Sequence, residues 1–146
     1  MADNQTHLTT LATVRVGDTL PQLVSAPISR TILALYCGAS GDHNPIHVDI
    51  DFARRSGMDD VFAHGMLPTA YVGRLLTDWA PQPWLRSLQV RFVAITHVGD
   101  IIHCNGRVVA VQEGADGNEV RVEISAADQT GQVKIQGQAV FAVPRQ

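Results

Sequence analysis

The sequence predicts an α+β domain in which an antiparallel β-sheet wraps around one long central α-helix. From residue 87 onward, apolar and polar residues alternate in four long runs separated by short turn signals. That pattern is typical of antiparallel strands with one buried face. Residues 66–79 are apolar around most of a helical circumference, which indicates a helix buried on several sides. This helix is the only segment apolar enough to cover the buried face, so we expect the sheet to curve around it.

Size and composition indicate one globular domain. The chain has 146 residues, of which 45% are hydrophobic and 17% charged, and we expect a flexible leader over 1–12 and a single domain over 13–146. Eleven basic and 14 acidic residues give a net charge of −3, which argues against nucleic acid or a membrane surface as partner. No apolar segment precedes the domain, and the two cysteines are too few for a disulfide scaffold. We therefore expect a cytoplasmic protein.

The first third of the chain predicts one strand and one helix. Residues 13–16 alternate and are followed by a turn at 17–18, which predicts a strand that joins the sheet. An extended segment around Val24 follows. Ser29 is the expected N-cap of a helix over 30–38, and Gly41 lies where such helices commonly end.

The middle of the chain predicts a polar loop and then two helices. Pro45 disfavours helical geometry at Asn44, so residues 42–47 should form a loop. A short helix through 52–54 follows, capped by Asp49 or Asp51. Gly65 then opens the long helix over 66–79. The strands of the sheet complete the chain, and we expect them over 87–96, 102–110, 120–126 and 133–143.

Most candidate reactive groups lie in or beside the polar loop: Asp42, His43, Asn44, His47 and Asp49. On a straight helix Asp42 and His47 would point roughly 140° apart around the axis. A turn at Asn44-Pro45 can instead fold both side chains toward one point. An ionised Asp or a neutral His within hydrogen-bond reach of a water can act as a general base. Asn44 has an amide that can orient the loop or the water.

Two separated segments carry a family resemblance. Residues 40–47 (SGDHNPIH) and residues 63–66 (AHGM) together resemble the MaoC-like family of hot dog-fold hydratases and dehydratases. That family includes R-specific enoyl-CoA hydratases and mycobacterial 3-hydroxyacyl dehydratase subunits. The resemblance implies a hot dog fold and (R)-specific hydration of trans-2-enoyl thioesters. The reverse reaction is dehydration of 3-hydroxyacyl thioesters, with the acyl group on CoA or acyl carrier protein in fatty-acid or related metabolism.

The resemblance also implies a role for each matching residue. Asp42 and His47 would hold and activate a water, and the backbone amide of Gly65 would donate to the thioester carbonyl. Some members of the family carry a serine on the long helix, about where this chain has Gly73. No cofactor is expected beyond the thioester carrier. The family pairs its domains, so the expected assembly is a homodimer or higher homo-oligomer, with a heterodimer of related subunits as the alternative.

Several other interpretations stay open. Asp42 alone could be a turn residue and His47 a core histidine, whereas His64 is expected to be structural and His43 exposed. The cluster of acids and histidines could also be a metal site, but no helical H-x-x-x-H pair or cysteine ligand set supports it, so no metal is expected.

Two other functions compete with hydration. One is a hot dog thioesterase, against which Asp78 counts as the only acid between Gly65 and Trp79. The other is a non-catalytic acyl-binding subunit of a heteromeric dehydratase.

Overall fold

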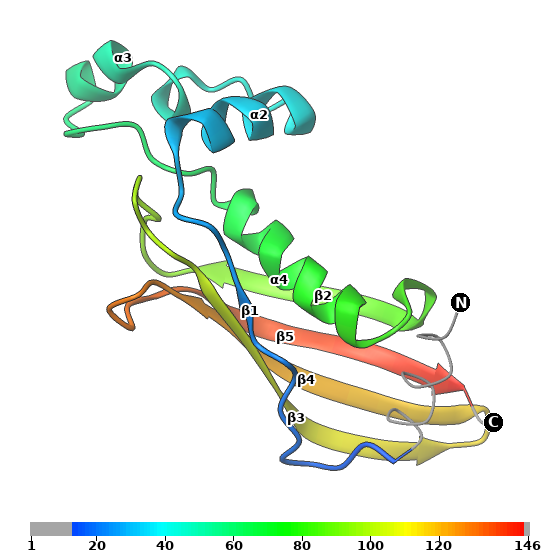
Figure 1. The fold of residues 1–146 in the computed structure, drawn as a ribbon. Coiled ribbons are helices and arrows are strands. Elements are labelled where there is room, and N and C mark those ends of the chain that lie inside the picture. Colours follow the sequence, from blue (N-terminus) through cyan, green and yellow to red (C-terminus); the bar gives the residue numbers. More distant parts are fainter. Residues whose placement is uncertain (1–12, 145–146) are drawn as a thin grey trace.

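The structure, a computed structural model, describes residues 13–144, so the expected leader at 1–12 lies outside the described residues. A five-stranded antiparallel sheet in the order β1-β3-β4-β5-β2 carries α4 on one face, while α2 and α3 lie beyond one end of the sheet (Figure 1). The strands are β1 (Leu23–Val24), β2 (Leu85–Phe92), β3 (His103–Gly114), β4 (Gly117–Ala127) and β5 (Val133–Pro144). The helices are α2 (Arg30–Ser40), α3 (Ile50–Arg55) and α4 (Met66–Trp79), with single 3₁₀ turns η1 (Pro45–His47) and η2 (Gln82–Trp84).

The core lies between α4 and the sheet. On β4, Val120, Val122 and Ile124 are buried and the intervening residues are exposed, as the alternation predicts. The bounds expected for the long helix are confirmed. The helix is buried on fewer sides than expected. Met66 is 54% exposed, and a stripe of the helix surface that includes Ala70 is also exposed to solvent. No helix within residues 13–144 has the length and apolar character needed to cross a membrane.

The helix caps follow the sequence. The Ser29 hydroxyl accepts a hydrogen bond from the Ile32 amide at 3.1 Å, so Ser29 is the N-cap of α2. The cap of α3 is Asp49, whose carboxylate accepts from two backbone amides, and Asp51 lies within the first turn.

Two expected strands are wrong in extent. Residues 13–16 form no strand, and the chain joins the sheet further along, through a bridge between Thr19 and Arg107 and then through β1. The strand expected over 87–96 ends at Phe92. Residues 93–97 then leave the sheet and contact the segment before α4, where the Ala63 amide donates to the Thr96 carbonyl at 2.9 Å. This contact ties the start of α4 to the sheet.

A buried lysine holds residues 93–97 in place. The Lys134 side chain is 1% exposed, and its ammonium group lies 3.0 Å from Asp128 and 3.3 Å from Asp100. It also donates to the Ile95 carbonyl at 3.0 Å. Hydrogen bonds, first from the Thr130 hydroxyl and then from Lys134, hold the pKa of the Asp128 carboxyl well below its usual range. Lys134, near the start of β5, therefore connects three segments of the chain. These are residues 93–97 through Ile95, the turn before β3 through Asp100, and the turn between β4 and β5 through Asp128.

Removing this lysine should destabilise the protein strongly. We expect Lys134→Met to lower the free energy of unfolding by about 3–5 kcal/mol, because two buried carboxylates lose their cation. Urea denaturation measures the change. The matched control is Arg121→Met, which removes an exposed ion pair to Glu119 with a 3.6 Å separation and should cost about 0–1 kcal/mol. Equal effects of the two substitutions would contradict a structural role for the cluster.

Candidate active site

The polar loop is shaped by its own side chains. α2 ends at Gly41, whose φ of 73° places it in the left-handed region that glycine adopts readily. The Asn44 side-chain oxygen accepts from the Ile46 amide at 3.2 Å and caps η1. The Asp42 carboxylate accepts from the Asn44 amide at 3.3 Å. Of the two roles expected for Asn44, orientation of the loop is therefore the one these contacts support.

His47 is buried and held in one tautomer. Its side chain lies at the end of η1, is 8% exposed, and places Nδ1 2.8 Å from the Phe62 carbonyl oxygen. Because a carbonyl can only accept, we assign the proton to Nδ1, which leaves a lone pair on Nε2. The Phe62 ring meets the imidazole edge-on at 5.0 Å. The free nitrogen of His47 is thus available as a base.

His64, for which a structural role was expected, belongs to the same cluster, as the alternative interpretation of a cluster of acids and histidines allowed. Its ring centroid lies 4.0 Å from that of His47, and its Nε2 lies 3.0 Å from the backbone carbonyl oxygen of Asp42. One ligand atom from each of Asp42, His47 and His64 lies within 4.8 Å of the other two. In the sequence, His64 lies within the AHGM segment that carries the family resemblance. His43 and Asp49, by contrast, are exposed, and Asp49 serves as a cap.

The same three side chains are of the types that bind zinc, which takes histidine nitrogen and carboxylate oxygen. The two imidazoles are each backed by a carbonyl, as metal-bound histidines usually are. The cluster could therefore hold a divalent cation. Water activation, the chemistry expected from the sequence, uses the same lone pairs.

The environment keeps His47 neutral. Burial lowers the pKa of His47 below its ordinary value of 6.5, and the neighbouring His64 lowers it further. The Phe62 carbonyl and the Asp42 charge act in the opposite direction but do not outweigh burial. A neutral imidazole with a free lone pair at pH 7 is the form that can take a proton from water.

Gly65 presents a free backbone donor beside this cluster. It precedes α4 with φ −58° and ψ −29°, it is exposed, and α4 has no side-chain cap. Within residues 13–144, no group accepts a hydrogen bond from the Gly65 amide. The first amides of a helix lack intrahelical partners and carry the positive end of the helix dipole. The geometry therefore suits a negatively charged or polarised oxygen placed at the start of α4.

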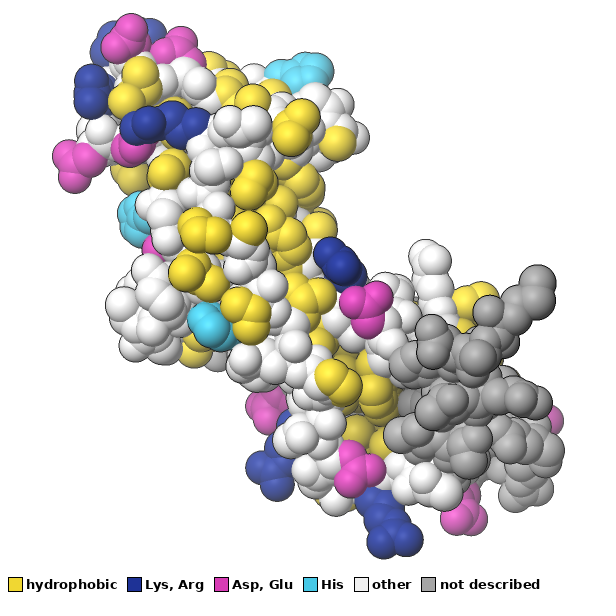
Figure 2. Space-filling view, viewed as in Figure 1, with side chains coloured by type: hydrophobic (Ala, Val, Ile, Leu, Met, Phe, Trp, Pro, Cys, Tyr) yellow, Lys and Arg dark blue, Asp and Glu magenta, His cyan; other side chains and the backbone are white. Residues whose placement is uncertain are grey.

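An apolar cavity adjoins the same point. It has a volume of about 370 Å³ and is lined by residues that include Phe62, Gly65, Pro68, Phe92, Ile95 and Ile135. Phe62 is the residue whose carbonyl holds His47, so the cavity begins next to both the base and the amide donor. The Phe92 ring lies over Gly65, where a Cβ atom would come within 3.0 Å of the ring. In Figure 2, hydrophobic side chains are exposed in the middle of the molecule. This region lies between the sheet and the end that carries α2 and α3.

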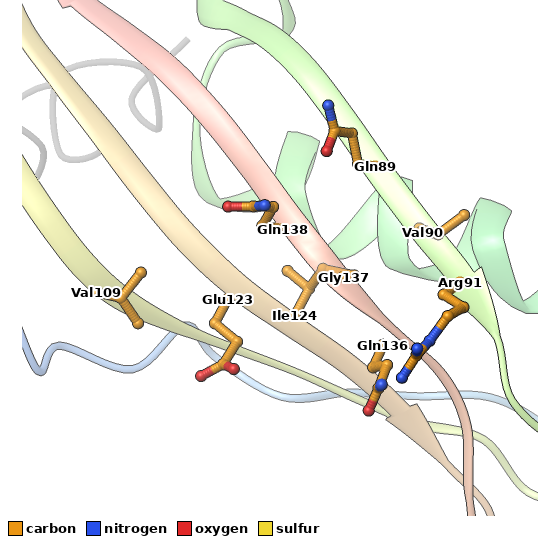
Figure 3. Close-up of a pocket in the computed structure, with 9 residues that line it drawn as sticks. All are labelled: Gln89, Val90, Arg91, Val109, Glu123, Ile124, Gln136, Gly137 and Gln138. Carbon is orange, nitrogen blue, oxygen red and sulfur yellow. The ribbon is translucent and has the colours of Figure 1, made fainter.

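A second hollow lies apart from these groups. It measures about 650 Å³ and follows the exposed face of β2, β4 and β5, where Gln89, Arg91, Glu123, Gln136 and Gln138 project from the strands (Figure 3). None of Asp42, His47, His64 or Gly65 lines it. We therefore place the site at the start of α4.

Comparisons with known proteins identify the family to which the chain belongs. Residues 11–130 match the family model described as MaoC like domain. The (R)-specific enoyl-CoA hydratase of Rhodospirillum rubrum is 29% identical over 126 residues, which cover 82% of this chain and 85% of the relative. The 3-oxo-4,17-pregnadiene-20-carboxyl-CoA hydratase beta subunit of Mycobacterium tuberculosis is 31% identical over 100 residues, covering 68% and 77%.

Solved structures give the same fold. The unliganded R-hydratase PhaJ1 of Pseudomonas aeruginosa superposes with a TM-score of 0.79 at 26% identity, covering 92% of this chain and 85% of that one. A chain of the ChsH1-ChsH2 complex of Mycobacterium tuberculosis superposes with a TM-score of 0.77 at 26% identity, covering 90% and 98%. The expected hot dog fold is confirmed. With a family model matched over well more than half of its length, the chain belongs to the MaoC-like family.

Proposed function

We propose that this protein catalyses the (R)-specific hydration of trans-2-enoyl thioesters and the reverse dehydration of 3-hydroxyacyl thioesters. The observation that carries the proposal is the convergence of the Asp42 carboxylate and the His47 imidazole beside the free amide of Gly65. The names of the relatives, an enoyl-CoA hydratase and a hydratase subunit, support the same reaction class.

Each group has a place in the reaction. The Asp42–His47 pair takes a proton from water as its oxygen bonds to carbon 3 of the enoyl group. Electrons of the double bond move toward the thioester carbonyl, whose oxygen gains negative charge and accepts from the Gly65 amide. Carbon 2 then receives a proton from the protonated Asp42–His47 pair, which restores the thioester, regenerates the base and leaves the 3-hydroxyacyl product. Dehydration follows the same path in reverse.

The apolar cavity is proposed to hold the acyl group. Its lining is mainly apolar, with Phe62, Pro68, Phe92 and Ile95 among the apolar residues, and Thr96 and Lys134 are its polar side chains. A thioester whose carbonyl meets the Gly65 amide would place its acyl end in this cavity and its carrier toward solvent. We propose no cofactor other than CoA or acyl carrier protein as the carrier.

Assembly into a dimer or a heteromer is part of the proposal. Met66, Phe92, Val93 and Ile95 are all more than 40% exposed beside the cavity. β2 is an edge strand that pairs only with β5, so its outer backbone groups are open to a second chain. The structural neighbour from Mycobacterium tuberculosis is itself a two-component complex. Light scattering on the purified protein measures the state of assembly.

Thioester hydrolysis is the competing activity, and the structure gives it little support. Asp78, the only acid on α4, lies near the far end of the helix and is exposed. Its carboxylate is 3.5 Å from Arg74 and remote in sequence from the cluster at the start of the helix.

A panel of enoyl-CoA substrates of increasing acyl size tests the function. Hydration removes the conjugated thioester absorbance without release of free thiol, and this is the expected result. Thiol release without hydration would instead establish a thioesterase. If the protein hydrates nothing alone but becomes active with a co-expressed related subunit, the heteromeric form of the proposal holds. Absence of both activities under all conditions would refute it.

The pH dependence of this reaction should report His47. Only neutral His47 can accept a proton, and its pKa is depressed below 6.5. We therefore expect kcat/KM to stay high at pH 6.5 and to fall only at lower pH, as His47 becomes protonated. The pH–rate profile measures the midpoint, and substitution of the exposed His43 by Asn should leave it unchanged. A midpoint at or above 6.5 would contradict the role assigned to His47.

A further inference from the structure

His64 carries an unused acceptor in the middle of the site. Its side chain is 1% exposed, and its Nδ1 is the one buried side-chain nitrogen or oxygen within residues 13–144 that has no hydrogen-bond partner. The other ring nitrogen, Nε2, faces the Asp42 carbonyl oxygen at 3.0 Å. Because that carbonyl can only accept, the proton belongs on Nε2 and Nδ1 keeps a lone pair. A histidine with a purely structural role would be expected to use both nitrogens.

Three acceptors therefore gather at one place. His47 is fixed by the Phe62 carbonyl so that its Nε2 lone pair is free, and His64 is fixed by the Asp42 carbonyl so that its Nδ1 lone pair is free. The two ring centroids lie 4.0 Å apart, and one nitrogen of each ring lies within 4.8 Å of the other and of an Asp42 carboxylate oxygen. A water molecule has two hydrogens to offer to such a set. One acceptor can remove a proton while a second holds the other hydrogen.

We propose that His64 is a third catalytic group, which holds the attacking water through Nδ1. The proposal rests on the hydratase function proposed above. The Asp42–His47 pair removes one hydrogen of the water, and His64 accepts a hydrogen bond from the other. With both hydrogens held, a lone pair of the water oxygen is directed at carbon 3. His64 neither gains nor loses a proton, and the hydrogen it holds remains on the new hydroxyl group.

His64 has a second contact that must be separated from this role. Its Nε2–H ties the polar loop to the segment before α4 through the Asp42 carbonyl. A substitution that breaks this tie would disturb Asp42 even if Nδ1 did nothing. Two amide side chains distinguish the contacts, because the amide of Gln reaches the position of Nε2 and the amide of Asn that of Nδ1.

The test compares His64→Gln with His64→Asn in the intact protein. His64→Gln keeps a donor for the Asp42 carbonyl but removes the Nδ1 acceptor. We expect it to lower kcat about 100-fold with little change in KM, since loss of orientation alone can cost that much. His64→Asn offers an acceptor near Nδ1 but loses the tie, and we expect a smaller loss in kcat. His43→Gln, an exposed control, should match the wild type.

The opposite ranking would overturn the proposal. If His64→Gln keeps wild-type kcat while His64→Asn is impaired, His64 is only the loop tie. Thermal unfolding of each variant shows whether the fold is retained.

Two-bond proton–nitrogen NMR spectra of the wild-type histidine rings provide a readout independent of activity. We expect the Nε2–H tautomer for His64 and the Nδ1–H tautomer for His47. A proton on His64 Nδ1 would overturn the inference. Failure of the wild type to hydrate any thioester would instead refute the underlying function.

Discussion

Asp42→Asn and His47→Asn should each lower kcat/KM for hydration by about 10²–10⁴-fold, the usual contribution of a positioned acid or base. Asn at position 42 keeps an oxygen that can accept from the Asn44 amide, so the loop retains that bond while the charge is lost. Asn at position 47 keeps an amide donor near the Nδ1 position for the Phe62 carbonyl but removes the free Nε2. Each substitution therefore removes the chemistry while keeping the local hydrogen bond.

Matched controls come from the same stretch of the chain. His43 and Asp51 are exposed, and His43→Asn and Asp51→Asn make the same chemical changes outside the cluster. Steady-state hydration of the best enoyl-CoA substrate, with circular dichroism to verify folding, measures all four variants. Wild-type rates for both Asp42→Asn and His47→Asn across the acyl panel would refute the proposed water activation.

Short-range patterns in the sequence correctly predicted the elements that depend on neighbouring residues, such as α4 and the N-cap of α2. The bounds of α4 follow from apolar periodicity and from the prolines after it, and the Ser29 cap follows from short-range hydrogen bonding. The strand expected over 13–16 failed because four alternating residues do not specify a partner. The edge of the sheet is instead taken by 19–24, which pair with β3 more than 75 residues later. Long-range pairing of this kind leaves no signal in a short window.

The same distinction applies to the site. Pro45 is a local reason for Asp42 and His47 to converge, and the structure places their ligand atoms within 4.8 Å. His64 was expected to be structural, and its contact was not predicted because its partner is the carbonyl of Asp42, 22 residues away. The contact that holds His47 comes from Phe62, which itself bridges to His97 after β2. The candidate residues were therefore predictable, but the groups that fix their tautomers were not.

Gly65→Pro should lower kcat for hydration by about 10²–10³-fold relative to Gly65→Ala, the usual effect of removing one oxyanion donor. Proline has no N–H and has a ring-fixed φ of about −65°. The backbone at Gly65 already has φ −58°, so the residue itself can accept proline. The donor would be lost while the start of α4 is kept, and the developing charge on the thioester oxygen would lose its partner. Because that charge is largest in the transition state, the loss should fall on kcat more than on KM.

Alanine is the necessary reference because both substitutions add a Cβ atom. That atom would lie 3.0 Å from the Phe92 ring, and Phe92 is 53% exposed, so the ring has room to move. Repeating the pair in a Phe92→Ala background removes the contact between the added Cβ atom and the Phe92 ring. A proline variant that is as active as the alanine variant in both backgrounds, with unfolding temperatures equal, would show that the thioester oxygen is held by another group. The start of α4 would then serve only to shape the cavity.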